Sequence, residues 1–166
     1  MTHRRAAEPQ LRPYLPADAP ALAAIFQTSV EELAAEDYSE AQLAAWAAAA
    51  DDIAAFSRRL SDGLTIVATL ASEPVGFASL KGGTIDMLYV DPEFAGQGVG
   101  SHLAEAMEKL AANRGVATLT VDASDTALPF FQSRGYAART RNTVPRGGEW
   151  LANTTMQKQL APGEAS

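Results

Sequence analysis

The chain has no cysteine among its 166 residues, and it has only two histidines, His3 and His102. Without a thiol it can form no disulfide, no thiolate metal site and no cysteine nucleophile. Two histidines are also too few for a zinc site built on imidazole ligands. We therefore predict a protein that works without a metal, while the lack of cysteine does not by itself fix a cellular compartment.

Positive charge is also scarce, because 13 Lys and Arg face 20 Asp and Glu and leave a net charge of −7. A nucleic-acid binder normally needs a basic face that neutralises phosphates, so this balance disfavours DNA or RNA as a partner. No apolar run is long enough to span a bilayer, and no apolar stretch of a secretory signal follows Arg4 and Arg5. The sequence predicts a cytoplasmic protein with neither nucleic acid nor membrane as a partner.

Length and composition favour one domain. A chain of 166 residues with 47% hydrophobic and 20% charged residues is ordinary for a single globular core. We expect a flexible arm over residues 1–8, a single domain over 9–160 and a flexible tail over 161–166. A homodimer is left open.

The spacing of apolar residues indicates helices and strands in a definite order. It predicts a strand over 10–14, a helix capped by Asp18, a helix opened by the capping box of Ser39 and Gln42, and its continuation over about 51–63. Strands follow over 64–71, 75–80 and 85–90, the first two joined by a turn through 72–74. A helix over 98–113, a strand over 116–121, a short helix over 126–133 and a hairpin over 136–144 and 150–158 complete the order. This order predicts an α+β fold with α/β/α layers, in which about seven strands form a mixed, mostly antiparallel twisted sheet with four or five helices.

A loop with three alternate glycines, Gly96, Gly98 and Gly100, joins the strand that ends at Val90 to the helix that follows. Glycine lets a backbone approach a ligand closely, and the first turn of a helix presents unsatisfied N–H groups and partial positive charge. That combination suits a phosphate. The dinucleotide pattern is absent because position 101 is Ser, and no Lys-Ser or Lys-Thr pair completes a P-loop. A tight turn that needs glycine only for packing is the alternative.

The run V-x-P-x-x-x-G-x-G-x-G from Val90 to Gly100 resembles the acyl-CoA-binding motif of the GNAT superfamily of acetyltransferases. The similarity continues through Asp122-Ala123-Ser124 and through Phe130-Phe131 to Gly135-Tyr136. The resemblance implies a GNAT-like fold and an acetyl-CoA-dependent N-acetyltransferase. Such an enzyme moves an acetyl group directly to an amine of a small molecule or a protein, with acetyl-CoA as co-substrate and no metal.

The resemblance also assigns residues to coenzyme A. Backbone N–H groups across 95–100 would hold the pyrophosphate, and two strand residues would pair with the pantetheine arm as an added strand does. Ser124 and the helix over 125–134 would flank the thiol end. The assigned residues are Leu88, Val90, Ala95, Gly96, Gln97, Gly98, Val99, Gly100, Ser101, Ser124 and Phe131.

Two positions depart from the family pattern. Ala95 stands where the family usually has Arg or Gln, and Phe131 stands where it often has a tyrosine that protonates the leaving thiolate. A phenyl ring has no proton to donate. Tyr89 or a water molecule would then supply the proton, or a thiolate would leave without an acid. A catalytically impaired CoA-binding domain, regulatory or interacting, is the alternative that these departures support.

An amine attacks a thioester only when it is neutral, so a general base is useful. Asp86, on the strand before the loop, is the candidate base, with a surface carboxylate as the alternative. Asp122 is a weaker candidate, for which the alternative is a cap of the strand end or of the next turn. Tyr38 and Trp46 are candidates for the acceptor pocket, although a tryptophan on a helix is often simply part of the core.

Three arginines of the last hairpin are candidates for binding an acidic acceptor. Arg139 and Arg141 stand two positions apart and should share one side of a strand, and Arg146 lies near the turn. A solvated strand face is the alternative that we favour for them.

Overall fold

One seven-stranded sheet runs through residues 8–160, the part of the chain that the computed structural model describes. The strands are β1 (Gln10–Pro13), β2 (Leu64–Leu70), β3 (Glu73–Lys81), β4 (Thr84–Val90), β5 (Thr118–Ser124), β6 (Ala137–Arg146) and β7 (Glu149–Gln159). The helices are α1 (Ala19–Leu33), α2 (Glu40–Ala47), α3 (Ile53–Asp62), α4 (Val99–Asn113) and α5 (Leu128–Ser133). The predicted flexible arm and tail fall mostly on residues 1–7 and 161–166, which lie outside the described residues.

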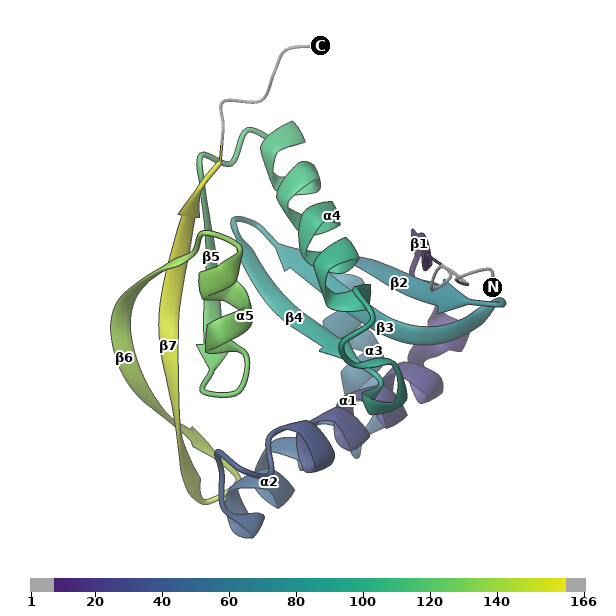
Figure 1. The fold of residues 1–166 in the computed structure, drawn as a ribbon. Helices are drawn as coiled ribbons and strands as arrows, with labels where there is room; N and C mark the ends of the chain where they lie inside the picture. The colour runs from purple at the N-terminus through teal and green to yellow at the C-terminus, as the bar shows by residue number, and fades with distance from the viewer. Residues whose placement is uncertain (1–7, 161–166) are drawn as a thin grey trace, which may run out of the picture.

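The sheet order is β1-β2-β3-β4-β5-β7-β6, and every neighbouring pair is antiparallel except the parallel pair β4–β5. Helices α1, α2 and α3 cover one face, called here the α1 face, and α4 and α5 cover the other, the α4 face (Figure 1). The predicted α/β/α layering, the mixed sheet and the number of strands and helices are therefore confirmed.

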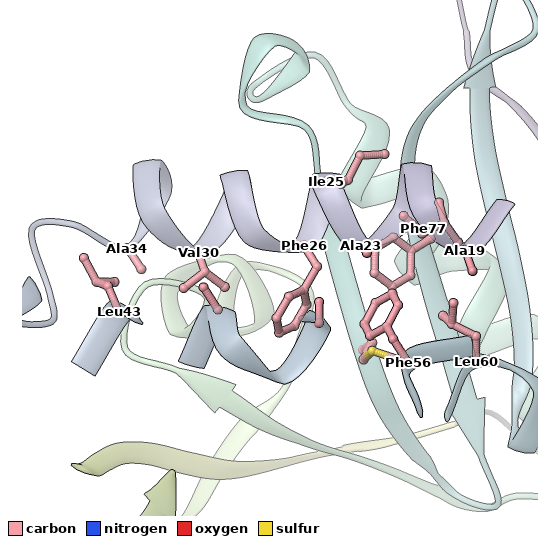
Figure 2. Packing of buried hydrophobic residues seen from close by; sticks show 14 of the residues in the cluster. Ala19, Ala23, Ile25, Phe26, Val30, Ala34, Leu43, Phe56, Leu60 and Phe77 are labelled. Atoms are coloured by element: carbon pink, nitrogen blue, oxygen red, sulfur yellow. The ribbon is translucent and has the colours of Figure 1, made fainter. Parts of the chain in front are cut away.

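The core on the α1 face is rich in aromatic side chains. Phe26 of α1 lies with its ring centroid 5.5 Å from that of Phe56 on α3 and 4.6 Å from that of Tyr89 on β4. Phe56 in turn meets Phe77 of β3 at 6.2 Å. Figure 2 shows the rings of Phe26, Phe56 and Phe77 beside α1. Burying a phenyl side chain contributes about 1.5–3 kcal/mol, so this cluster fixes α1 and α3 against β3 and β4.

The core on the α4 face is built on one stripe of the crossover helix. Val99, Leu103, Met107 and Ala111 recur every four residues along α4 and are buried against the sheet. Glu108 of the same helix is bonded to the far half of the sheet. It accepts hydrogen bonds from Arg134 at 3.0 Å, Tyr136 at 2.9 Å and Lys158 at 3.2 Å. The crossover helix is thereby fixed to the segment between α5 and β6 and to β7.

Three local expectations were wrong. The β2–β3 turn is a two-residue loop, Ala71-Ser72, with φ of +49° and +67°, and Glu73 already pairs with Leu70. Such tight hairpins need positive φ at both positions, which non-glycine residues adopt rarely, so the residue types Ala and Ser did not indicate a two-residue turn. Asp18 makes no side-chain cap on α1; its carboxylate accepts two hydrogen bonds from Arg12, each 2.8 Å long.

The third wrong expectation concerns β6. The register passes from Ala138, opposite Met156, to Thr140, opposite Thr155, so Arg139 is the extra residue of a β-bulge. The bulge breaks the simple alternation that we used to place Arg139 beside Arg141.

Within residues 8–160, no helix is long and apolar enough to cross a membrane.

Candidate active site

The two halves of the sheet separate between β4 and β5. Only two positions pair across them, Thr84 with Thr120 and Ile85 with Val121. Beyond these positions the strands diverge, and a cavity of about 800 Å³ lies along the gap, lined from both faces of the sheet. The gap leaves one edge of β4 without a neighbouring strand.

The free edge belongs to the backbone groups of Leu88 and Val90. The amide of Asp91 donates to the carbonyl of Val75 on β3 at 2.8 Å. Backbone groups point alternately to the two sides of a strand, so those of Leu88 and Val90 point away from β3 and into the gap. A chain that lies in the gap can therefore pair with β4.

A β-bulge at Asp86 decides which side chains of β4 face which helices. Ser79 is opposite Met87 while Leu80 is opposite Ile85, which leaves Asp86 as the extra residue. Ile85 consequently packs in the core of the α4 face and Met87 in that of the α1 face. Ile85 and Met87 are two positions apart and would share a face in a regular strand. The bulge places them on opposite faces of the sheet.

The glycine loop has the backbone conformation that its sequence indicated. Gly96 and Gly98 have φ of +76° and +88°, the left-handed region that glycine adopts freely. Gly98 is the N-cap of α4 and lacks a side chain that could satisfy the helix amides. The amides of Val99, Gly100 and Ser101 therefore have no acceptor within the helix, and Gly98, Gly100 and Ser101 line one end of the cavity.

Most of the residues that we selected from the sequence line this one cavity. The lining includes Tyr38, Trp46, Asp86, Leu88, Tyr89, Val90, Ala95, Gly96, Gly98, Gly100, Ser101, Ser124 and Phe131. Gln97, Val99 and Arg139 are not among the lining residues. Gln97 is exposed and donates to the carbonyl of Glu93, and Val99 is buried in the core.

The far side of the gap is formed by the end of β5 and the start of α5. Ser124 accepts a hydrogen bond from the amide of Ala127 at 3.1 Å, which shapes the turn into α5. Phe131 is only 3% exposed and packs edge-on against Phe130 and Tyr136. At the position of the expected tyrosine, the cavity wall is apolar.

Asp86 is paired with a cation that sequence reasoning missed. Arg59 of α3 donates through Nε to Oδ2 of Asp86 at 3.0 Å and through Nη2 to Oδ1 at 3.3 Å. Arg59 stands three residues after the buried Phe56, on the flank of the apolar stripe of α3. That spacing alone gave no sign of a contact with β4.

Tyr89 carries its hydroxyl on the α1 face, among the rings of Phe26, Phe77 and Trp46. Burial raises the pKa of Tyr89, and the nearby charges of Arg59 and Arg146 are smaller influences that lower it. The phenol is therefore protonated at neutral pH, the form in which it can donate a proton.

Tyr38 links three segments through its hydroxyl. It donates to the carbonyl of Ala152 on β7 at 2.7 Å and accepts from the amide of Asp125 at 2.9 Å. Burial is the main cause that raises the pKa of Tyr38. Trp46 packs edge-on against it, with ring centroids 5.4 Å apart. Both side chains form cavity wall, and Trp46 also packs against the core of the α1 face.

The three arginines of the last hairpin have separate surroundings. Arg141 forms an ion pair with Asp125 and also donates to Thr154. Arg139 is exposed at its bulge, away from the cavity lining. Arg146, near the β6–β7 turn, lines the cavity.

A cavity with a free strand edge on one side and unpaired helix amides at one end suits a long, thin ligand with a phosphate group. The family model for the acetyltransferase (GNAT) domain matches residues 34–160. The chain belongs to the GNAT family. It is therefore an acyltransferase of the N-acetyltransferase class.

Individual relatives agree with this assignment. The chain is 38% identical over 148 residues to YafP of Escherichia coli, an uncharacterized N-acetyltransferase; the match covers 89% of this chain and 94% of YafP. A GCN5-related N-acetyltransferase from Rhodopseudomonas palustris is 60% identical, with a TM-score of 0.92 over 96% of this chain and all (100%) of that one. The PaiA N-acetyltransferase of Thermoplasma acidophilum, solved with coenzyme A, shares the fold at a TM-score of 0.76 and 20% identity, over 92% and 99% of the two chains.

Proposed function

We propose that this GNAT protein transfers an acetyl group from acetyl-CoA directly to an amine, with no covalent enzyme intermediate. The observation that carries the proposal is the free edge of β4 beside the open amides of α4 in one cavity. The complex of the PaiA relative with coenzyme A supports this choice of donor. We propose the cytoplasm as the location, because acetyl-CoA is available there.

The donor would lie along the gap. Its pyrophosphate would accept hydrogen bonds from the amides of Val99, Gly100 and Ser101, where the helix dipole also favours negative charge. The pantetheine arm would pair with the backbone of Leu88 and Val90. The thioester would then reach the middle of the cavity, beside Ser124 and the apolar wall of Phe131.

The acceptor would approach from the α1 face, where Asp86 and Tyr89 lie. The neutral amine attacks the thioester carbonyl, and the N–C bond forms as the carbonyl oxygen becomes an oxyanion that a backbone amide near Val90 on the free edge of β4 can stabilise. Asp86, directly or through a water, accepts the proton from the amine nitrogen. The C–S bond then breaks, and the thiolate of coenzyme A leaves, protonated by Tyr89 or by solvent.

A binding test and a turnover test decide this proposal. Acetyl-CoA at ~100 times its dissociation constant should stabilise the fold by about 2.7 kcal/mol, seen as a rise in melting temperature that NAD and ATP do not match. Release of free coenzyme A thiol with a panel of amines then measures transfer. Binding without turnover of any amine would favour the impaired CoA-binding alternative, and no stabilisation by acetyl-CoA would contradict the proposal altogether.

A further inference from the structure

Four charged side chains line the cavity: Arg59, Asp86, Asp122 and Arg146. Three of them have polar side-chain partners. Arg59 and Asp86 pair with each other, and Asp122 accepts a 2.6 Å hydrogen bond from the hydroxyl of Thr155. Within residues 8–160, the guanidinium of Arg146 donates only to the backbone carbonyl of Pro145, at 3.3 Å. The cavity thus has one cation without a carboxylate partner among the described residues.

The register of the last hairpin fixes the face on which Arg146 lies. Val144 is opposite Leu151, and both pack with the core of the α1 face. Arg146 is two residues beyond Val144 and so shares that face. The positive charge of Arg146 is also one of the smaller influences that lower the pKa of Tyr89, whose main shift, caused by burial, is upward. Arg146 is therefore at the rim of the part of the cavity that the acceptor amine would use.

The nearest acidic side chain along the strand does not neutralise Arg146. Glu149 is directly opposite it across the β6–β7 turn, yet no ion pair joins the two in the described part of the chain. The planar fork of a guanidinium matches the two oxygens of a carboxylate or a phosphate, and such paired hydrogen bonds are among the strongest in proteins.

At the same end of the cavity, the last hairpin is in contact with α2 and with the segment that precedes it. The hydroxyl of Tyr38 joins the segment between α1 and α2 to both β7 and the β5–α5 loop. Gln42 of α2 donates to the carbonyl of Trp150 at 2.8 Å, and Gly147 packs so closely on α2 that an added Cβ would lie 3.3 Å from that of Ala45. An added strand needs about 4.7–4.9 Å between itself and its neighbour. The contact between α2 and the β6–β7 turn leaves no such space, so an extended polypeptide cannot lie between them.

We infer that the acceptor is a small amine that also carries an anionic oxygen group, a carboxylate or a phosphate, which Arg146 binds while the amine reaches Asp86 and the thioester. The inference rests on the proposed function and specifies its substrate class. The aromatic wall of Phe26, Trp46 and Tyr89 would cover the apolar part of such an amine.

Matched pairs of acceptors test the inference through kcat/KM for thiol release. L-phenylalanine is compared with L-phenylalaninamide, O-phosphoethanolamine with ethanolamine, and all four with a lysine-containing hexapeptide. At least one anionic member should exceed its neutral partner by ~10-fold or more, as expected for a hydrogen-bonded charge pair. The pair with the larger ratio of anionic to neutral kcat/KM shows whether the site prefers a carboxylate or a phosphate. Amine basicity cannot produce a preference for phenylalanine, because phenylalaninamide has the larger neutral fraction at a given pH.

Two variants assign the preference to Arg146. In Arg146→Gln the ratio within the preferred pair should fall toward 1, and in Glu149→Gln it should rise because a repulsive charge is lost. Arg58→Gln removes the same charge from the exposed side of α3 and should leave the ratio and the rates as they are. Equal use of neutral and anionic amines, or better use of the hexapeptide, would overturn this inference while leaving the proposed function intact. Failure of every amine would overturn both.

Discussion

At the scale of single residues, the candidate base is defined by its backbone and by its partner. The bulge in β4 turns Asp86 toward α3, and Arg59 occupies both of its oxygens. A carboxylate bonded in this way has fewer lone pairs left to accept a proton from the acceptor amine. If it takes a proton during catalysis, it does so at the remaining lone pairs or through a bridging water.

We expect Asp86→Asn to keep affinity for acetyl-CoA but to lower kcat by ~10²–10⁴, the usual cost of removing a general base. The loss should shrink as pH rises, because a growing share of the amine is neutral without help. The pH profile of kcat measures this. A profile that matches the wild type would show that Asp86 is only the partner of Arg59.

Arg59→Gln is the control for that experiment. It breaks the same ion pair but leaves the carboxylate in place. The two variants should lose similar stability in urea, while Arg59→Gln keeps most of the rate. If kcat falls by the same factor in both variants, the ion pair acts by positioning the strand and the substrate, and Asp86 does not transfer a proton.

Asp18 should make stability depend on pH. Hydrogen bonds from Arg12, opposed in part by burial, hold the pKa of Asp18 below its ordinary value. A depressed pKa contributes stability above the unfolded pKa of ~3.9 and loses it as pH falls through the lower folded pKa. Asp18→Asn should therefore cost about 1–2 kcal/mol at pH 7, and the difference from wild type should shrink as pH falls below ~3.9.

Urea unfolding at pH 7, 5 and 3 measures that difference. Arg12→Gln should cost little more once Asp18 is already Asn, because the two substitutions remove one interaction. Additive losses, or a difference that does not shrink between pH 5 and pH 3, would show that Asp18 acts through something other than the ion pair.

At the scale of elements, the two ends of α4 offer a matched comparison. Gly98 at the start and Gly115 beyond the end have φ of +88° and +82°, and an added Cβ would meet nothing closer than 3.9 Å at the first and nothing within 4 Å at the second. Gly98→Ala and Gly115→Ala should each cost about 1–2 kcal/mol in backbone strain. Only Gly98→Ala should weaken acetyl-CoA binding in calorimetry, because it alone disturbs the amides that open into the cavity. Equal affinities would make the loop glycines purely structural.

The β2–β3 hairpin should be open to improvement. Ala71 and Ser72 hold positive φ that Asn and Gly adopt more readily. We expect the double substitution Ala71→Asn, Ser72→Gly to stabilise the fold by about 1 kcal/mol, or about 2–4 °C in melting temperature. Acetyl-CoA affinity should not change, since Ala71 and Ser72 do not line the cavity. A lower melting temperature would mean that the turn conformation differs from the one described.

Elements with a clear period could be predicted from sequence, while features set by pairing could not. The stripe of α4 and the capping box of Ser39 and Gln42 depend on neighbours three or four residues apart, and both are present. The bulges at Asp86 and Arg139 depend on the partner strand. The contact of Arg59 with Asp86 joins residues 27 positions apart. The part of the cavity lining at the start of α4 followed from one motif, but most of the other lining residues and the partner of Asp86 did not.

At the scale of the whole molecule, the sheet consists of two halves that pair with each other at only two positions. The first half holds β1 to β4 with α1 and α3, and the second holds β5 to β7. Glu108 on α4 and the hydroxyl of Tyr38 connect the halves around the gap. A ligand that lies in the gap would complete the sheet between them.

Hydrogen exchange can test this arrangement in one measurement. Acetyl-CoA should slow exchange of the amides of Leu88 and Val90 and of the first turn of α4, and should leave β1 and its pairing with β2 unchanged. The analogue 3′-phospho-ADP, which has the pyrophosphate but no pantetheine arm, should protect only the start of α4. The difference between the two ligands then isolates the pairing of the arm with β4. If the analogue protects Leu88 and Val90 as well as acetyl-CoA does, protection spreads from the helix end through general tightening of the fold, and the free edge of β4 has no direct part in binding.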